Sequence, residues 1–211
     1  MAEKGISSAV IKRLPRYYRY LNELLLNGVD RISSKELSEK MNVTASQIRQ
    51  DLNNFGGFGQ QGYGYNVEFL LTEIGKILGL DRENRLIIIG GGHLGQALAG
   101  YTSFEKRKFK VMAVFDVDEK LIGTKIGNVP VFHMKDVEQY IKENEISIAA
   151  ITIPKEVAYE TAALLVKCGI KAFWNFVPRD LQLPDSVVVE NVHLTESLMT
   201  LSYKMHNMFQ N

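Results

Sequence analysis

The segment RLIIIGGGHLGQAL, residues 85–98, constrains the fold of this chain more than any other part of the sequence. Its first half is a short apolar run, which is typical of a buried strand. The run ends directly in glycines, and a segment suited to a helix follows them. We therefore expect a buried strand that turns sharply into a helix.

The glycines of this turn have a spacing that suits a phosphate group. Gly90, Gly92 and Gly95 form the pattern G-x-G-x-x-G. The first glycine permits a sharp turn, the second lets the backbone approach a pyrophosphate, and the third lets the helix pack on the strand. No Lys-Ser or Lys-Thr pair follows, which disfavours a nucleoside triphosphate loop. The expected contact residues are Gly90, Gly91, Gly92, His93, Leu94 and Gly95.

An acidic residue follows at the distance that a dinucleotide fold requires. The next apolar run, KVMAVFDVDEK, reaches Asp116, which is 21 residues after Gly95. A carboxylate there accepts hydrogen bonds from an adenosine ribose and repels a 2′-phosphate, so we expect NAD(H) rather than NADP at Asp116 and Val117. The alternative is a glycine-rich turn that binds no ligand.

Strands and helices alternate after residues 81–84. We expect strands at 85–90, 111–115, 147–152, 171–175 and 187–190, with helices between several of them. This alternation predicts an α/β fold of the Rossmann type, in which a parallel sheet has helices on both faces. The polar segment DREN marks a domain boundary, which gives expected domains at 1–80, 81–192 and 193–211.

The first 80 residues predict a winged helix-turn-helix domain. A helix is expected at 14–27 with Pro15 in its first turn, and two further helices start at the capping residues Ser33 and Thr44. The second and third helices are joined by about three residues, which defines a helix-turn-helix. The glycine-rich segment GGFGQQGYGYN after them predicts a β-hairpin, or wing, and VEFLLTEIGKILGL one more helix.

This domain has the features of a DNA-binding module. Residues 1–50 contain nine Lys or Arg against five Asp or Glu. In a helix-turn-helix, the start of the second helix meets base edges, and basic residues nearby meet phosphates. We expect base contacts from Thr44, Ser46, Gln47, Arg49 and Gln50, phosphate contacts from Lys12, Arg13, Arg16 and Arg19, and backbone contacts from the wing glycines Gly59 and Gly62. The alternative is a small helical dimerisation or cap domain.

Catalytic groups are scarce in the sequence. The four histidines are scattered, with His133 expected in a loop, and together with the single cysteine they have no metal-ligand spacing. Too few residues remain for a substrate domain, so we expect a cofactor sensor rather than an enzyme, with no metal. The lone cysteine and the lack of a signal peptide or an apolar span predict a cytoplasmic protein.

The last helix, LTESLMTLSYKMHNMF, has an apolar seam. Leu194, Leu198, Leu201, Met205 and Met208 are spaced 4, 3, 4, 3, which favours pairing with a second copy of the chain. Packing of this helix against its own sheet is the alternative.

Taken in order, several segments resemble the redox-sensing repressor family Rex. They are RLPRYYRYL, SSKELSEKMNVTASQIRQDLNNFGGFGQQGYGYNV, IIIGGGHLGQALAGY, VFDVD, FWNFVP and LTESLMTLSY, and they span essentially the whole chain. The resemblance implies a homodimer that exchanges its C-terminal helices. It also implies binding to inverted-repeat operator DNA when NADH is low, and release when NADH rises.

The resemblance also assigns roles to individual residues. It places Arg16 and Tyr101 in the switch between DNA-bound and NADH-bound forms, and Pro154, Asn175 and Phe176 near the nicotinamide. His193 stands where the family often has an Asp in the switch, and Gln50, Gln60 and Gln61 stand where it often has basic residues. The wing contacts are then Gly59, Gln60, Gly62 and Tyr63.

A charge argument gives the direction of sensing. A pocket walled by Phe176 and Pro154, without a carboxylate, disfavours the positive ring of NAD⁺, so NADH binds more tightly. Three alternatives stay open. They are a small NAD-dependent oxidoreductase, a CoA-binding module with an N-terminal helical cap, and a DNA-binding protein whose Rossmann unit is only a dimer scaffold.

Overall fold

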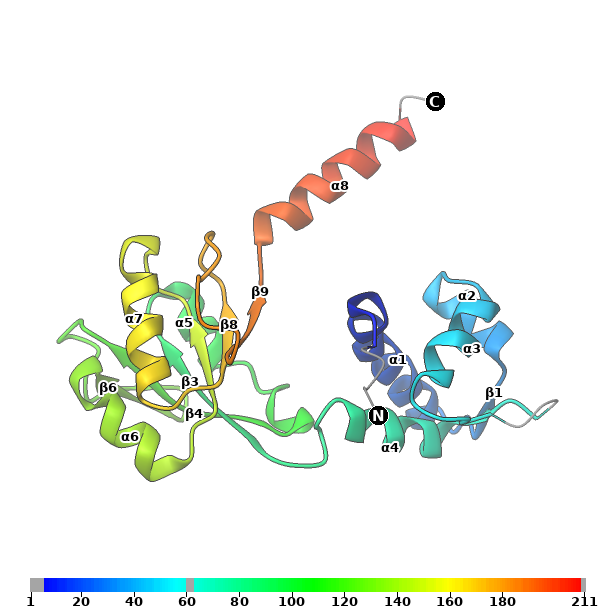
Figure 1. The fold of residues 1–211 in the computed structure, drawn as a ribbon, viewed down its shortest axis with the longest axis horizontal. Coiled ribbons are helices and arrows are strands. Elements are labelled where there is room, and N and C mark those ends of the chain that lie inside the picture. Colours follow the sequence, from blue (N-terminus) through cyan, green and yellow to red (C-terminus); the bar gives the residue numbers. More distant parts are fainter. Residues whose placement is uncertain (1–5, 60–62, 210–211) are drawn as a thin grey trace. The chain divides into compact units, whose positions relative to one another are not determined.

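The computed structural model describes residues 6–59 and 63–209 and divides the chain into two compact units, 1–82 and 83–211 (Figure 1). Unit 1 contains four helices and a short two-stranded sheet among its described residues. These elements are α1 (Ser8–Leu26), β1 (Arg31–Ile32), α2 (Ser34–Met41), α3 (Ala45–Asn53), β2 (Tyr65–Asn66) and α4 (Val67–Ile77). Their shared core includes Tyr17, Leu21, Leu37, Ile48 and Leu70.

The caps of the helix-turn-helix are confirmed. The Ser33 hydroxyl accepts a hydrogen bond from the Glu36 N–H, and the Glu36 carboxylate accepts one from the Ser33 N–H. The Thr44 hydroxyl accepts a hydrogen bond from the Gln47 N–H. These caps satisfy N–H groups that a helix start leaves without partners, and so they fix where α2 and α3 begin.

The start of the first helix was predicted wrongly. Helix α1 begins at Ser8 with Ser7 as its cap, so that Pro15 lies inside the helix rather than in its first turn. The apolar stripe extends back from Leu14 to Val10, which is also buried. Proline removes one internal hydrogen bond, and the burial of this longer stripe offsets that loss.

The glycine-rich segment does not pair with itself among its described residues. Its strand β2 pairs in antiparallel fashion with β1, which precedes α2, with Ile32 opposite Tyr65. The prediction of a hairpin within residues 56–66 is therefore corrected: the strand after the helix-turn-helix pairs with the strand before it. Part of the predicted wing, residues 60–62, lies outside the described residues.

Unit 2 is built on a seven-stranded sheet of order β5-β6-β4-β3-β7-β8-β9, in which every pairing except β5 with β6 is parallel. The strands are β3 (Asn84–Ile89), β4 (Phe109–Asp116), β5 (Lys125–Ile126), β6 (Val129–His133), β7 (Ile148–Ile151), β8 (Ala172–Asn175) and β9 (Val188–Asn191). The helices are α5 (His93–Ala99), η1 (Glu105–Arg107), η2 (Met134–Asp136), α6 (Val137–Asn144), α7 (Lys155–Lys167) and α8 (Leu194–Phe209).

All five predicted strands are present, with ends that shift by at most two residues. Strands β5 and β6 were not predicted. His133, which was expected in a loop, is the last residue of β6 and lies opposite Asp116 in the register.

The two faces of the sheet are covered unequally. Helices α6 and α7 pack on one face through residues such as Ile141, Ala158 and Leu165, whereas α5 contributes Leu98 and Ala99 to the cluster on the other face. On β7, β8 and β9 a groove of about 380 Å³ remains, lined by apolar side chains that include Ile148, Ala172 and Trp174.

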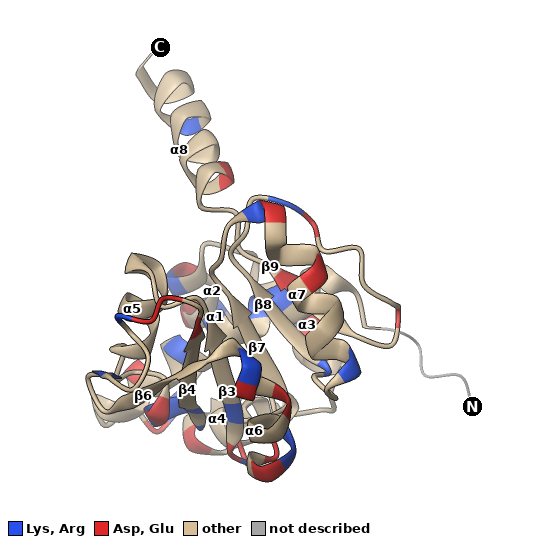
Figure 2. Cartoon of the chain, turned by 90° about the vertical axis from the view of Figure 1, so that its left-hand side faces the viewer, with Lys and Arg blue, Asp and Glu red and all other residues tan. Residues whose placement is uncertain are grey.

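Helix α8 leaves the end of β9 and projects away from the sheet (Figure 1). Its seam residues are exposed, from 56% at Met205 to 76% at Met208. Most of α8 is drawn in tan in Figure 2, because few of its residues are charged; its sequence includes Glu196, Lys204 and His206. The seam therefore does not pack on its own sheet. No helix among the described residues is long and apolar enough to cross a membrane.

Candidate nucleotide site and nucleic-acid interface

The glycine turn connects β3 to α5 at the point where the strand order reverses. Gly90 has a φ of +102°, a conformation that side chains disfavour, and a Cβ there would lie 2.9 Å from the Thr152 carbonyl oxygen. A Cβ at Gly95 would overlap the carbonyl oxygen of Gly90. The turn therefore requires glycine at both positions, because a side chain at either one would clash with the protein's own backbone.

Gly92 differs from its two neighbours in the motif. A Cβ at Gly92 would meet no protein atom within 4 Å, and its φ of −67° is open to any residue. The backbone at this position faces open space, which fits the close approach of a ligand phosphate that the motif predicts.

Asp116 is tied to the same turn. One of its carboxylate oxygens accepts a hydrogen bond from the Gly91 N–H, and the other accepts from the N–H groups of Val117 and Asp118, at 2.6 and 2.8 Å. These donors hold the carboxylate beside the turn, where its remaining lone pairs can accept from ribose hydroxyls.

A cavity of about 880 Å³ lies beside the turn, at the carboxyl ends of β3, β4 and β7. Ligands bind at this position in open α/β sheets. Five of the predicted residues line it: Gly90, Gly92, Asp116, Val117 and Pro154. His93 and Leu94 are in the first turn of α5 and are exposed.

Sequence reasoning missed part of this lining. Met134, Ile153 and Val157 add an apolar wall, and Thr152 also lines the cavity. The expected absence of a carboxylate is wrong for this cavity, because Glu160 also lines it from the second turn of α7. The period of a helix that starts after Pro154 could have revealed Val157 and Glu160.

Phe176 and His193 line a different cavity, of about 480 Å³. The Nε2 atom of His193 lies 3.5 Å from a carboxylate oxygen of Asp180. Asn175 is corrected to a structural residue. It is fully buried, and its amide nitrogen donates to the Arg179 carbonyl and to the Asn191 side chain. These bonds use both side-chain N–H groups of Asn175 and fix the loop that follows β8.

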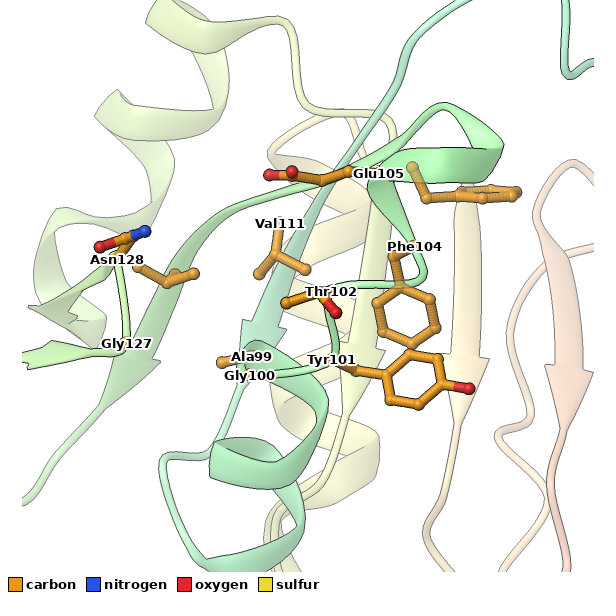
Figure 3. A pocket seen from close by; sticks show the side chains of 11 residues that line it. Ala99, Gly100, Tyr101, Thr102, Phe104, Glu105, Val111, Gly127 and Asn128 are labelled. Carbon is orange, nitrogen blue, oxygen red and sulfur yellow. The ribbon is translucent and has the colours of Figure 1, made fainter.

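Tyr101 lies just beyond α5 beside a pocket of about 190 Å³ (Figure 3). Its ring centroid is 4.8 Å from that of Phe104, which is in turn 5.6 Å from Trp174. Tyr101 is 56% exposed, so its hydroxyl remains accessible to a partner.

On unit 1, the predicted base-reading residues lie along α3. Thr44 caps the helix, Ser46, Arg49 and Gln50 are exposed, and Gln47 is half-buried. Arg49 also donates a hydrogen bond to the Ser34 hydroxyl at 3.0 Å. The start of α3 thus presents polar side chains as a recognition helix does.

The basic residues of α1 have unequal roles. Lys12 is exposed, and Arg16 is exposed while one of its nitrogens donates to the Met41 carbonyl at 2.8 Å, at the end of α2. Arg13 was expected to be free for phosphates, but its guanidinium is paired with the buried carboxylate of Asp51. Burial of that carboxylate requires a cationic partner, which explains the difference.

The wing residues are described in part. Tyr63 is 70% exposed, and its carbonyl accepts a hydrogen bond from Arg31. A Cβ at Gly59 would lie 2.8 Å from the Tyr65 ring, so this glycine permits a close approach to that ring. Gln60 and Gly62 lie outside the described residues. Across residues 6–59 and 63–209, no group of three His, Cys, Asp or Glu could hold a metal ion.

Comparison with known proteins covers both units. Residues 81–179 match the family described as CoA binding domain, and residues 5–53 match the putative DNA-binding protein N-terminus family. A redox-sensing transcriptional repressor Rex of Thermoanaerobacter sp. (strain X514) is 61% identical over 207 residues, which are 98% of this chain and 92% of that protein.

Two solved structures are similarly close. The crystal structure of RSP in complex with beta-NAD⁺ and operator DNA is 60% identical, has a TM-score of 0.92, and matches over 97% of this chain and 94% of that one. The structure of RSP in complex with beta-NADH is 57% identical with a TM-score of 0.89, over 96% and 95%.

The fold and the site define a class of protein in which a helix-turn-helix unit for nucleic acid is joined to a Rossmann unit for a nucleotide. The similarity to known proteins runs through both units and through α8. The chain belongs to the family of redox-sensing transcriptional repressors named Rex.

Proposed function

We propose that this chain represses transcription by binding operator DNA as a homodimer when NADH is low, and that NADH releases it. The observation that carries the proposal is the joint presence of the capped helix-turn-helix and the cavity beside the Gly90–Gly95 turn. The relatives that were solved with NAD⁺ and operator DNA, and with NADH, support it.

The nucleotide contacts are assigned on the basis of the cavity. The turn Gly90, Gly91, Gly92, His93, Leu94 and Gly95 would hold the pyrophosphate, and Asp116 with Val117 the ribose. Pro154, in the wall of the cavity, would face the nicotinamide end. Phe176 lines the separate cavity of about 480 Å³ and is assigned to the nicotinamide end on the family resemblance alone. NAD(H) supplies a nicotinamide whose charge changes with its oxidation state, and the protein binds and orients it.

A preference for NADH follows from the character of the cavity. Its lining is mainly apolar, through residues such as Ile153, Pro154 and Val157, and an apolar wall disfavours the positive ring of NAD⁺. Glu160 acts in the opposite direction, but it is exposed and solvent screens its charge. We expect NADH to bind more tightly, and Glu160→Gln to widen the preference.

CoA is the second candidate ligand, because residues 81–179 match a family described as CoA binding domain. CoA carries a phosphate on its ribose, which the Asp116 carboxylate would repel. The same argument disfavours NADP. The carboxylate therefore favours NAD(H) over both. The similarity to transcriptional repressors supports a sensor rather than a dehydrogenase.

Arg16, Tyr101 and His193 are proposed as switch residues. Each has an exposed or half-exposed side chain with a polar group. The proposal for α8 is pairing with a second copy, which supplies the second recognition helix that an inverted repeat requires.

Calorimetry with NADH, NAD⁺ and CoA, and gel shifts on selected DNA with and without NADH, test this function. Asp116→Ala is expected to weaken NADH binding about tenfold or more, since it removes charge-assisted hydrogen bonds, and to leave DNA binding intact.

Arg49→Ala is expected to weaken DNA binding and to leave NADH binding intact. Ser34→Ala is the control for the hydrogen bond between Arg49 and Ser34. Equal affinities for both nucleotides, a DNA complex insensitive to NADH, or turnover of a hydroxy-acid panel would contradict the proposal.

A further inference from the structure

Three polar side chains, two from α1 and one from α3, meet at the carboxylate of Asp51. Arg13 Nε and Nη2 lie 2.6 and 2.8 Å from the two carboxylate oxygens. The Tyr17 hydroxyl donates to one oxygen at 2.9 Å, and Gln47 Nε2 donates to the other at 2.7 Å. The carboxylate of Asp51 thus connects α1 to the side chain of Gln47, which was predicted to contact DNA bases.

Asp51 remains ionised in this cluster. It is 0% exposed, and burial alone would raise its pKa, but the hydrogen bonds from Arg13, Gln47 and Tyr17 outweigh burial and hold the pKa below its usual 3.8. Burial and the bond to Asp51 raise the pKa of Tyr17, so that its hydroxyl keeps its proton and donates. An ionised carboxylate only accepts hydrogen bonds.

This chemistry decides how the Gln47 amide is oriented. Because Asp51 can only accept, the amide nitrogen of Gln47 must face it, and the amide oxygen cannot exchange places with the nitrogen. Gln47 is left with one N–H and one carbonyl oxygen for other partners. Gln47 is the third residue of α3, in the part of a recognition helix that meets base edges.

We propose that Asp51 is a positioning residue for base recognition, which locks Gln47 in the polarity that reads adenine and rejects guanine. Adenine presents one acceptor, N7, and one donor, the N6 amino group, in the major groove, which complements the remaining N–H and carbonyl of Gln47. Guanine presents two acceptors there, and the locked amide can satisfy only one of them. This inference rests on the proposed function, since it requires α3 to lie in the major groove.

The role of Arg13 and Tyr17 follows from the same contacts. They hold Asp51 from the side of α1, and neither is bonded to Gln47. Loss of the Tyr17 hydroxyl removes one bond to Asp51 but leaves the Asp51–Gln47 bond in place. Tyr17→Phe is therefore a control: it lowers the stability of unit 1 but leaves the orientation of the Gln47 amide fixed.

The test measures binding of the full chain to a selected operator and to every single base-pair substitution of it. The wild type is expected to prefer adenine over guanine by about tenfold at one position in each half-site. Gln47→Met and Asp51→Asn should each reduce that ratio to near one at that position alone, and the double variant should do no more. Asp30→Asn, the same change at an exposed site of unit 1, should leave the ratio unchanged, as should Tyr17→Phe.

A measurement on the wild type covers the case in which Asp51→Asn fails to fold by circular dichroism. Replacing the adenine with 7-deazaadenine, which lacks N7, or with purine, which lacks the amino group, should each weaken binding. The inference is overturned if Gln47→Met alters the base preference at no operator position, or if the position that it alters prefers guanine in the wild type. It is also overturned if folded Asp51→Asn keeps the full adenine-to-guanine ratio, or if Tyr17→Phe loses that ratio. A wild type that binds no DNA would instead refute the proposed function.

Discussion

The indole of Trp174 and the ring of Phe176 lie edge to face at the end of β8, with their centroids 4.5 Å apart. Trp174 is the only tryptophan in the chain. Its fluorescence therefore reports on the residue that is proposed to face the nicotinamide.

NADH is expected to quench the emission of Trp174, because the reduced nicotinamide absorbs at the wavelengths at which tryptophan emits. NAD⁺ lacks this absorption band and should quench less at equal occupancy. A titration of the full chain with each nucleotide measures both. Trp174→Phe should abolish the signal while calorimetry still detects NADH. Unchanged emission at saturating NADH would show that the nicotinamide binds elsewhere.

Gly95→Ala is expected to abolish most NADH binding. The added Cβ would overlap the Gly90 carbonyl oxygen, so the turn must shift to relieve the overlap, and a weakening of about tenfold or more in Kd is expected. Gly100→Ala, at the other end of α5, meets its nearest atom at an ordinary 3.5 Å and is the matched control. DNA binding without nucleotide should survive both substitutions.

The Asp51 cluster makes the stability of unit 1 depend on pH in a defined direction. The pKa of Asp51 is below 3.8 in the folded state, so its stabilising contribution is fully present above that value and is lost as pH falls through the folded pKa. Asp51→Asn should lower the free energy of unfolding by about 1–3 kcal/mol at neutral pH. Thermal melts should show this difference shrinking as pH falls below 3.8. A difference that stays constant down to the lowest pH would contradict the assignment.

Leu201→Glu is expected to yield a monomer. Leu201 is 60% exposed at the centre of the α8 seam, and a carboxylate there would have to be buried when two copies pair. Light scattering after size exclusion measures the mass, and gel shifts on an inverted repeat should show weaker binding. Asn207→Glu adds the same charge away from the seam and should remain dimeric. A dimeric Leu201→Glu variant would exclude α8 as the main contact.

Local features could be predicted from the sequence because their causes are local. Ser33 and Thr44 cap the helices that follow them, and the glycines of residues 90–95 form the turn that their spacing requires. The strands β3, β4 and β7 were found because buried strands consist of apolar runs.

The features that were missed depend on distant partners. Strand β6 contains Pro130, which argues against a strand, yet its backbone pairs with β4 over residues 131–133. The pairing of β1 with β2 joins segments of two residues that have no pattern of their own. The role of Asp51 had no local signal in the sequence, because its partner Arg13 lies 38 positions away.

The position of Asp51 has a consequence for how such proteins diverge. The same carboxylate lies in the interior of unit 1 and accepts a hydrogen bond from Gln47, the side chain that is proposed to contact DNA. If a substitution of Asp51 changes the base pair that Gln47 reads, it also lowers the stability of unit 1. Gln50 is exposed, so a substitution there can change DNA contacts without that loss of stability. Operator specificity should therefore change first through substitutions at the exposed residues of α3.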